Sequence, residues 1–206
     1  MEGKLIYIFG IDGSGKTTLV KNLEKYFIEN TVFLQTFSEP YYTTELENAA
    51  NKLNASKRSI FSQQLRSCTW MLDLVRTTNE IIIPNLLNGQ NVIVDRYALC
   101  NRVYLEILNH EQINYMGQIL NCLPSPSLGF YLDISVEKAM HRIQLRNKQI
   151  APYEKIDLLE KLKDRYEKYI NIENYPIYVM DANKSELEIC SSVLSHINEH
   201  KGGHRG

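Results

Sequence analysis

The chain has 206 residues, of which 44% are hydrophobic and 23% charged, a composition typical of a folded globular protein and unlike a disordered or collagenous one. Its net charge of −1 at pH 7 excludes attraction to nucleic acid or a membrane through overall charge, and no dominant basic patch is visible. The expected partner is therefore a small molecule. We expect one domain over residues 1–200 and a disordered, glycine-rich tail over residues 201–206.

The cysteines and the N-terminus favour a cytoplasmic protein. The four cysteines are widely spaced and form no C-x-x-C or zinc-ligand pattern, so we expect free thiols. The apolar run Leu5–Phe9 is too short for a secretory signal or a membrane span.

Short apolar runs alternate with longer stretches of helical period. This alternation predicts β-α-β units, hence an α/β fold with a five-stranded parallel sheet and helices on both faces. The stretch Ser59–Leu87 is expected to form one long helix or two in tandem, ended by the Pro84 and Gly89 signals. The other predicted elements, in chain order, are a strand at Leu5–Phe9, a helix at Lys16–Asn30, strands at Val32–Thr36, Asn91–Val94 and Gly129–Leu132, helices at Val136–Asn147 and Lys155–Ile170, a strand at Ile177–Met180 and a helix at Glu186–Ile197.

The first predicted strand leads into GIDGSGKTT, which fits the G-x-x-x-x-G-K-T pattern of a phosphate-binding P-loop. The match is specific because a predicted strand precedes it and a predicted helix follows it. Glycines let backbone N–H groups approach phosphate oxygens, Lys16 is expected to reach the terminal phosphates, and Thr17 is expected to ligate magnesium. We therefore predict that ATP and Mg²⁺ bind at Gly10, Gly13, Ser14, Gly15, Lys16, Thr17 and Thr18.

A second charged motif follows the third predicted strand, which ends in Asp95-Arg96-Tyr97. Open α/β sheets place ligand-facing groups at the carboxyl ends of their strands. We expect Asp95 to hold magnesium through water and Arg96 to bridge phosphates. Alone, such a motif would be a strand cap with a surface ion pair about as often as a site, but beside a P-loop it favours a site.

These motifs resemble those of the thymidylate kinase family, among the P-loop nucleotide and nucleoside kinases, over nearly the whole chain. The resemblance implies a P-loop kinase fold with a small lid at about residues 142–155, and ATP-dependent phosphoryl transfer to a nucleoside monophosphate, dTMP or a relative. The segments that carry it are GIDGSGKTT, Ser38-Glu39-Pro40, Trp70, IIIPNLLNGQNVIVDRY, YLDIS at Tyr131–Ser135, HRIQLR at His141–Arg146 and VMDANKS at Val179–Ser185.

The resemblance also explains a carboxylate inside a phosphate-binding loop. In thymidylate kinases the acidic residue of this loop turns toward the sugar hydroxyl of the acceptor, so Asp12 would contact the acceptor. Because Gly13 stands where some members carry an arginine, the compensating cations would come from the lid, with Arg142, Arg146 and Lys148 as candidates; Arg142 would also contact ATP. Such cations would stabilise the charge on the transferred group. The catalytic set that follows is Asp12, Lys16, Glu39, Arg96 and Arg146.

The sequence departs from the family where the acceptor would bind. Members carry Arg-Glu-Pro, whose arginine clamps the acceptor phosphate, and Ser38 replaces that arginine here. Trp70 stands at the position of the stacking phenylalanine, but the thymine-reading arginine four residues later is Leu74, so Arg76 or Arg66 would have to substitute. The expected substrate-binding set is Asp12, Glu39, Trp70, Arg76, Arg96, Tyr97, Asn101 and Arg102.

Two alternatives stay open at this point. DRYALCNRVYL is also similar to the E-R-S-x-x-S-x-R segment of deoxynucleoside kinases, which would make Glu39 the base toward a 5′-hydroxyl and place Arg102 beside the base and sugar. A nucleoside has no phosphate to clamp, which agrees with Ser38. The other alternative is a catalytically silent, ATP-binding regulatory module, which the retained P-loop and DRY residues disfavour. Family members are commonly homodimers, and the apolar run from Trp70 to Ile83 would suit such an interface; a monomer is the other option.

Overall fold

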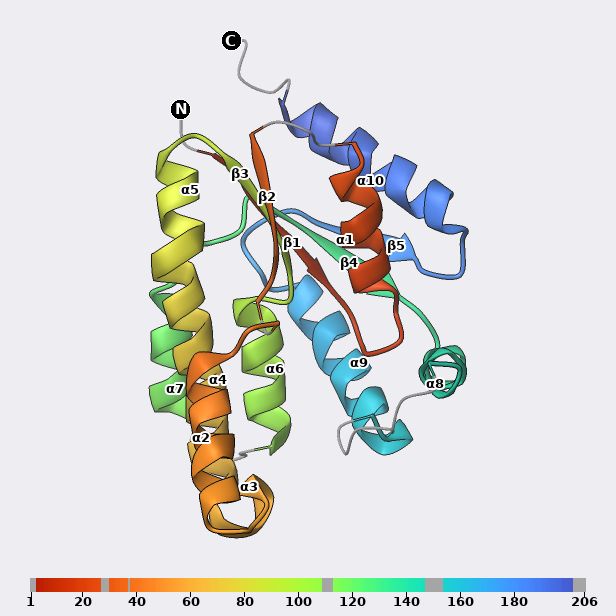
Figure 1. The fold of residues 1–206 in the computed structure, drawn as a ribbon. Helices are drawn as coiled ribbons and strands as arrows, with labels where there is room; N and C mark the ends of the chain where they lie inside the picture. The colour runs from red at the N-terminus through yellow and green to blue at the C-terminus, as the bar shows by residue number, and fades with distance from the viewer. Residues whose placement is uncertain (1–2, 27–29, 37, 109–112, 147–153, 202–206) are drawn as a thin grey trace.

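The computed structural model describes residues 3–26, 30–36, 38–108, 113–146 and 154–201. Five parallel strands form one sheet in the order β2-β3-β1-β4-β5 (Figure 1). The predicted five-stranded parallel sheet is therefore confirmed. The strands are β1 (Leu5–Phe9), β2 (Thr31–Gln35), β3 (Asn91–Asp95), β4 (Leu128–Asp133) and β5 (Ile177–Asp181), each of which overlaps a predicted strand.

Helices cover both faces of the sheet (Figure 1). Connections between parallel strands are right-handed, so the connection that runs from β1 outward to β2 and those that run the other way lie on opposite faces. Accordingly α1 packs against α10 on one face, and α4, α6 and α9 pack in sequence on the other. The helices are α1 (Lys16–Glu24), α2 (Tyr41–Lys52), α3 (Lys57–Ile60), α4 (Gln63–Thr77), the π-helical turn η1 (Thr78–Ile82), α5 (Ile83–Leu87), α6 (Ala98–Leu108), α7 (Ile113–Asn121), α8 (Val136–Gln144), α9 (Ile156–Ile170) and α10 (Glu186–Lys201).

The central strand β1 positions the chain's two charged motifs, the P-loop and Asp95-Arg96-Tyr97. All five of its residues are buried, as expected for a strand covered on both faces. It pairs with β3 so that Ile8 lies opposite Asp95, and the backbone N–H of Arg96 donates to the carbonyl of Ile8 at 3.1 Å. The loop that follows Phe9 and the DRY motif that follows Val94 therefore emerge side by side at the carboxyl edge of the sheet.

Of the two options for Ser59–Leu87, one long helix or two in tandem, the structure has a divided path. A break at Phe61 separates α3 from α4, whose first turn is capped by Ser62 Oγ, the acceptor of a 3.2 Å hydrogen bond from the N–H of Leu65. Pro84 does not end the helical path as expected. The wider π-helical turn η1 precedes it, which accommodates a residue that lacks an N–H group, and the path ends only near Gly89, whose φ is 77°.

Other helix predictions need correction. The sequence analysis did not predict the helices α2, α6 and α7, of which α6 and α7 follow the DRY motif. The helix α1 ends at Glu24, earlier than the predicted Asn30, while α10 continues to Lys201. Most of the expected lid and of the tail, residues 147–153 and 202–206, lie outside the described residues.

Candidate active site

The loop between β1 and α1 has the backbone geometry that close approach to an anion requires. Gly13 and Gly15 have φ of 84° and 98°, in the left-handed region that favours glycine. A Cβ at Gly13 would lie 2.5 Å from the carbonyl oxygen of Ala139 in α8, so this position has no room for a side chain. The loop ends at the N-terminus of α1, where free N–H groups and the helix dipole favour phosphate oxygens.

Lys16 is buried beneath this loop, with 5% of its surface exposed. Its Nζ donates a hydrogen bond to the carbonyl of Ile11 at 2.9 Å. Burial, together with the positive charge of Arg96, lowers the pKa of Lys16 to about 8, although Asp12 and Asp95 act in the opposite direction. A buried ammonium whose pKa is lowered in this way gains from any anion that binds beside it.

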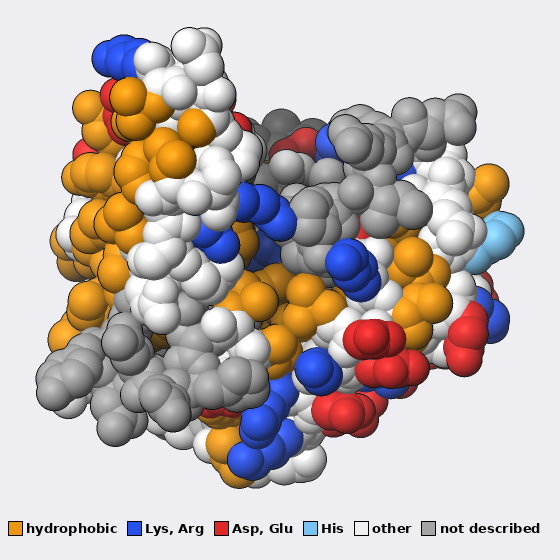
Figure 2. Space-filling model, turned by 90° about the horizontal axis from the view of Figure 1, so that it is seen from below, with side chains coloured by type: hydrophobic (Ala, Val, Ile, Leu, Met, Phe, Trp, Pro, Cys, Tyr) orange, Lys and Arg blue, Asp and Glu red, His pale blue; other side chains and the backbone are white. Residues whose placement is uncertain are grey.

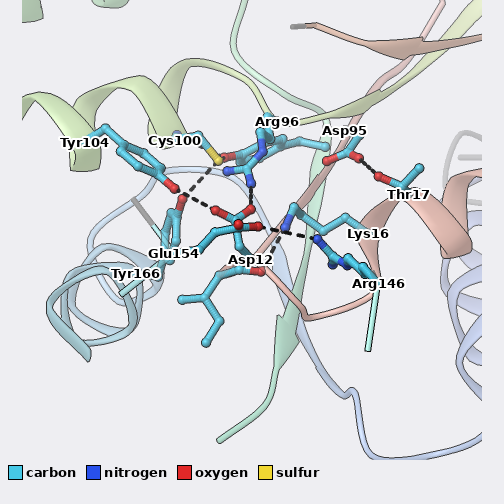
Figure 3. A network of polar contacts seen from close by, with 12 residues as sticks. Asp12, Lys16, Thr17, Asp95, Arg96, Cys100, Tyr104, Arg146, Glu154 and Tyr166 are labelled. Carbon is cyan, nitrogen blue, oxygen red and sulfur yellow. Dashed lines mark hydrogen bonds and ion pairs between the residues drawn. The ribbon is translucent and has the colours of Figure 1, made fainter. Parts of the chain in front are cut away.

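Thr17 and Asp95 bring together two oxygen atoms of the kind that ligate metal ions, beneath the loop (Figure 3). Thr17 Oγ1 donates to Asp95 Oδ2 at 2.9 Å. The other carboxylate oxygen, Asp95 Oδ1, is buried and has no hydrogen-bond partner among the described residues. Magnesium binds through one or two protein oxygens together with waters and substrate phosphates, so this pair fits such an ion.

A cavity of about 290 Å³, the P-loop cavity, opens beside the loop and is lined by Gly13, Ser14, Gly15, Thr18, Arg142 and Ala182 among others. Arg142, from α8, forms part of its wall. The guanidinium of Arg142 donates to the carbonyl of Ala182 at 2.8 Å and to that of Gly13 at 3.5 Å. It therefore joins the loop to the segment after β5, and its planar face borders the space available to a bound nucleotide.

A second and larger cavity, the Asp12 cavity, lies on the other side of the loop and has a volume of about 440 Å³. Seen from below, the molecule is hollowed on this side, with Lys and Arg side chains around the hollow (Figure 2). Arg146 borders both cavities. The residues that line the Asp12 cavity come from widely separated parts of the chain: Asp12, Pro40, Lys57, Arg58, Trp70, Arg96, Cys100, Asn101, Tyr104, Arg146 and Glu154.

Asp12 lies at the centre of a polar network between these elements (Figure 3). One carboxylate oxygen, Oδ1, accepts a hydrogen bond from Arg96 Nη2, and the other accepts one from Tyr104 Oη at 3.3 Å. Burial opposes the ionisation of Asp12, but the charges of Arg96 and Lys16 outweigh it and hold the pKa of Asp12 below its usual range. Asp12 is thus a carboxylate whose repulsion of phosphate is already offset by cations.

Arg96 is held in an unusual backbone conformation at the end of β3. Its φ of 70° is in the left-handed region, which residues other than glycine rarely adopt. Thr36 Oγ1 donates to the carbonyl of Arg96 at 2.7 Å, and the N–H of Arg96 is bonded to β1. Because both backbone groups are fixed, the side chain points to Asp12 and the cavity, and Asp12 raises the pKa of Arg96 well above its usual range despite burial.

Aromatic and neutral polar groups form the rest of the wall. Trp70 from α4 and Tyr104 from α6 meet edge to face, with ring centroids 6.4 Å apart. Asn101 is buried, and its Nδ2 has no hydrogen-bond partner among the described residues. Cys100 accepts hydrogen bonds on Sγ from Tyr7 at 3.0 Å and Tyr166 at 3.1 Å. The cavity therefore offers an apolar face and an unused amide donor beside the charged network.

The family model for thymidylate kinase matches residues 8–193, which is most of the chain. The chain belongs to the thymidylate kinase family. That family comprises nucleotide kinases with ATP as the phosphate donor. The thymidylate kinase of Legionella pneumophila is 30% identical to this chain over 97% of it and 96% of the relative. The probable thymidylate kinase of Pyrococcus horikoshii is 28% identical over 95% of this chain and 96% of the relative.

Among solved structures, the thymidylate kinase from Candida albicans matches with a TM-score of 0.75 and covers 97% of this chain and 93% of its own. The sequence identity of 21% makes this a likeness of fold, which is the P-loop kinase fold expected from the motifs. No helix within the described residues is long and apolar enough to cross a membrane.

The structure brings together most of the residues that the sequence singled out for this thymidylate kinase-type site. Lys16, Thr17 and Asp95 lie beneath the loop. The P-loop cavity also has Arg142 in its wall, and the Asp12 cavity has Trp70, among others. Lys148 lies outside the described residues.

Four expected substrate residues lie elsewhere. Glu39 is exposed, does not line the Asp12 cavity, and makes no hydrogen bond or ion pair with a described residue. Arg76 pairs with Glu80 at 3.0 Å and stacks on Tyr41, because its turn of α4 faces α2 and solvent. The other two, Tyr97 and Arg102, also lie away from the cavity.

Tyr97 is a core residue, 1% exposed, whose ring packs against that of Tyr7. Arg102 donates to Asn121 and pairs with Glu173 at 3.6 Å, because it lies on the side of α6 opposite the cavity. We therefore do not propose Arg76, Tyr97 or Arg102 as acceptor-binding residues.

The sequence analysis missed Lys57 and Arg58 and gave no binding role to Tyr104. Lys57 and Arg58 begin α3, whereas the predicted helix starts only at Ser59, and no motif pointed to them. Tyr104 has a signal in retrospect: it lies four residues after Cys100, one turn along α6, and both line the Asp12 cavity. Burial strongly raises the pKa of Tyr104, which donates a hydrogen bond to Asp12.

Proposed function

We propose that this protein transfers the γ-phosphoryl group of ATP to dTMP in the presence of Mg²⁺, yielding ADP and dTDP. The observation that carries the proposal is the Asp12 cavity, which adjoins the P-loop and combines the Asp12–Arg96 pair with Trp70 and Asn101. In the reaction the bond between Pγ and the β,γ-bridging oxygen breaks, and a bond forms between Pγ and a phosphate oxygen of the acceptor. Membership in the thymidylate kinase family supports this acceptor over others.

Within that proposal the charged residues have separate tasks. Lys16 would give up its hydrogen bond to Ile11 and donate to phosphate oxygens instead. Their negative charge would stabilise the buried ammonium. Arg96 would lie between Asp12 and the acceptor phosphate, while Asp12 would accept a hydrogen bond from a neutral sugar hydroxyl. Arg146 borders both cavities, which suits a cation that stabilises charge on the transferred group.

Trp70 and Asn101 would hold the base. The ring of Trp70 is half-buried and offers a flat apolar surface to it, and the amide of Asn101 offers a buried donor to a base carbonyl. Leu74, at the family's arginine position, is fully buried, so the polar contact to the base would come from Asn101 instead.

We propose that Thr17 and Asp95 hold magnesium, which would neutralise charge on the bound phosphates when present. Among the described residues, no group of three or more His, Cys, Asp or Glu forms a ready-made metal site. A site with one carboxylate agrees with an ion that arrives with the nucleotide and keeps several waters.

The nucleoside-kinase alternative is not favoured by the geometry. It requires Glu39 as base and Arg102 beside the base and sugar, and neither lines the Asp12 cavity. A silent regulatory module is disfavoured because the P-loop lysine, the magnesium pair and Arg96 are all in place.

The deciding experiment follows ADP release with ATP and Mg²⁺ against a paired panel, each natural nucleoside beside its 5′-monophosphate, in ribo and deoxy forms. We expect turnover on dTMP and little or none on thymidine. Turnover on nucleosides alone would contradict the proposal, and an absence of turnover on every acceptor would favour the regulatory module.

Of the two oligomeric states left open, the homodimer has support from Leu72 and Ile81, which are 46% and 37% exposed within the apolar run Trp70–Ile83. Size-exclusion chromatography with light scattering separates the two states. The cytoplasmic location remains a proposal that rests on the four free cysteines, and fractionation of the source cells tests it.

A further inference from the structure

The cations that line the Asp12 cavity differ in one respect, namely whether a carboxylate already neutralises them. Among the described lining residues there are four, and three of them are paired: Arg96 with Asp12, Lys57 with Glu47, and Arg146 with Glu154 at 3.7 Å. The fourth, Arg58, makes no hydrogen bond or ion pair with any described residue. It is the cavity cation whose charge and donors remain available to a ligand.

The surroundings of Arg58 favour an anion. A second cation, Arg66, lies close enough to feel its charge: burial and the charge of Arg58 together lower the pKa of Arg66. Arg58 and Arg66 both border a smaller cavity of about 100 Å³ that Trp70 also lines. Neither arginine forms an ion pair with a described residue, so the two gain from a ligand that brings negative charge, and a phosphate monoester carries a charge between about −1.5 and −2 at neutral pH.

Arg58 is also placed to reach such a ligand. It is the second residue of α3, held by the Ser56 cap at the edge of the hollow, and its side chain is exposed on the solvent side of the cavity. On the β2 side, the cavity's neighbour Ser38 offers only a hydroxyl, which donates to the carbonyl of Gln35 at 2.9 Å. No cation of the described part of that loop competes for the same anion.

We propose that Arg58 binds the phosphate group of the acceptor nucleotide in the Asp12 cavity. A guanidinium donates two parallel hydrogen bonds to phosphate oxygens, which a lysine cannot do with the same geometry. This inference rests on the proposed function, because the phosphorylated acceptor supplies the anion. It makes the short helix α3 a determinant of the preference for a monophosphate over a nucleoside.

The first test compares steady-state kinetics of the wild type with those of Arg58→Ala and Arg58→Lys. Charge-assisted hydrogen bonds of this kind correspond to roughly a 10- to 100-fold change, so we expect Arg58→Ala to raise KM for dTMP by that factor. We expect KM for ATP to stay within about twofold, since Arg58 does not line the P-loop cavity, and Arg58→Lys to give an intermediate KM for dTMP. Lys52→Ala is the matched control, because it removes a positive charge from exposed surface of the neighbouring α2 outside the cavity.

The second test measures binding through the fluorescence of Trp70, the only tryptophan, which lines the same cavity. Arg58→Ala should weaken dTMP binding by the factor found in KM and leave thymidine binding unchanged. An unchanged affinity for dTMP, or an equal loss for dTMP and thymidine, would overturn the role of Arg58 while the proposed function stands. If the wild type neither binds nor phosphorylates dTMP, the proposed function fails and this inference fails with it.

Discussion

The P-loop cavity and the Asp12 cavity both have Arg146 in their walls, but otherwise different parts of the protein form them. The P-loop brings its backbone to the P-loop cavity at Gly13, Ser14 and Gly15, and Arg142 in the cavity wall bonds two backbone carbonyls. The Asp12 cavity is formed by residues from widely separated parts of the chain, and most of its charged side chains are paired within the protein. Backbone N–H groups can bind any phosphate chain, whereas side chains can be replaced one at a time by substitution. Differences in acceptor preference should therefore arise in the Asp12 cavity.

The largest expected effect concerns the P-loop, which the reaction with every acceptor would use. Lys16→Ala should lower kcat for any acceptor by at least about 10³-fold, because no other buried ammonium lies beneath the loop within the described residues. Lys21→Ala, an exposed lysine of the same helix α1, is the matched control and should retain wild-type kcat. Wild-type-like turnover by Lys16→Ala would remove the proposed mechanism.

The next effect concerns the central pair of the Asp12 cavity. Arg96→Met should reduce the free energy of unfolding by about 3 kcal/mol, because it leaves the carboxylate of Asp12 buried without its cation. Adding Asp12→Asn to that variant should restore part of the loss, measured by urea denaturation. If the double variant is less stable than Arg96→Met alone, the two side chains do not form the pair described.

A smaller effect is expected in the pH dependence of ATP binding. In the free protein Lys16 has a pKa of about 8, and bound triphosphate requires its charged form, so ATP binding should weaken as pH rises through 8. Linkage gives roughly a tenfold rise in Kd for ATP between pH 7.5 and pH 9, measurable by calorimetry. Lys16→Arg, which stays charged, should bind ATP without this slope. A wild-type Kd that is flat over this interval would contradict the lowered pKa.

The smallest expected effect is at Glu39. Because Glu39 is exposed and does not line the Asp12 cavity, Glu39→Gln should change kcat with dTMP by less than about fivefold, against about 10²-fold or more for loss of a general base. Glu45→Gln, another exposed carboxylate nearby on α2, provides the comparison. A large loss specific to Glu39→Gln would mean that its loop moves into the site when substrates bind.

The P-loop cavity and the Asp12 cavity also differ in how far the sequence predicts them. Lys16 and Thr17 are contiguous with the strand and helix that place them, so local pattern suffices, and the buried strands follow from their apolar runs. Arg76 and Arg102 are helical residues, and the direction in which each side chain points depends on the rotation of α4 and α6 about their own axes. Sequence periodicity does not determine that rotation in a mainly apolar helix such as α6. Arg58 depends on the break at Phe61, a tertiary feature with no strong local signal.

Gly13 and Ala139 illustrate what such packing means for the history of the family. Since a Cβ at Gly13 would meet the backbone of Ala139 at 2.5 Å, a lineage that gains a side chain in the loop must first displace α8. Because these are main-chain atoms of Ala139, relatives with a side chain at the position of Gly13 should have a displaced α8 whatever residue stands at the position of Ala139. Superposed structures of thymidylate kinases with and without this glycine would display the displacement, and it would tie the loop's evolution to a helix remote from it in sequence.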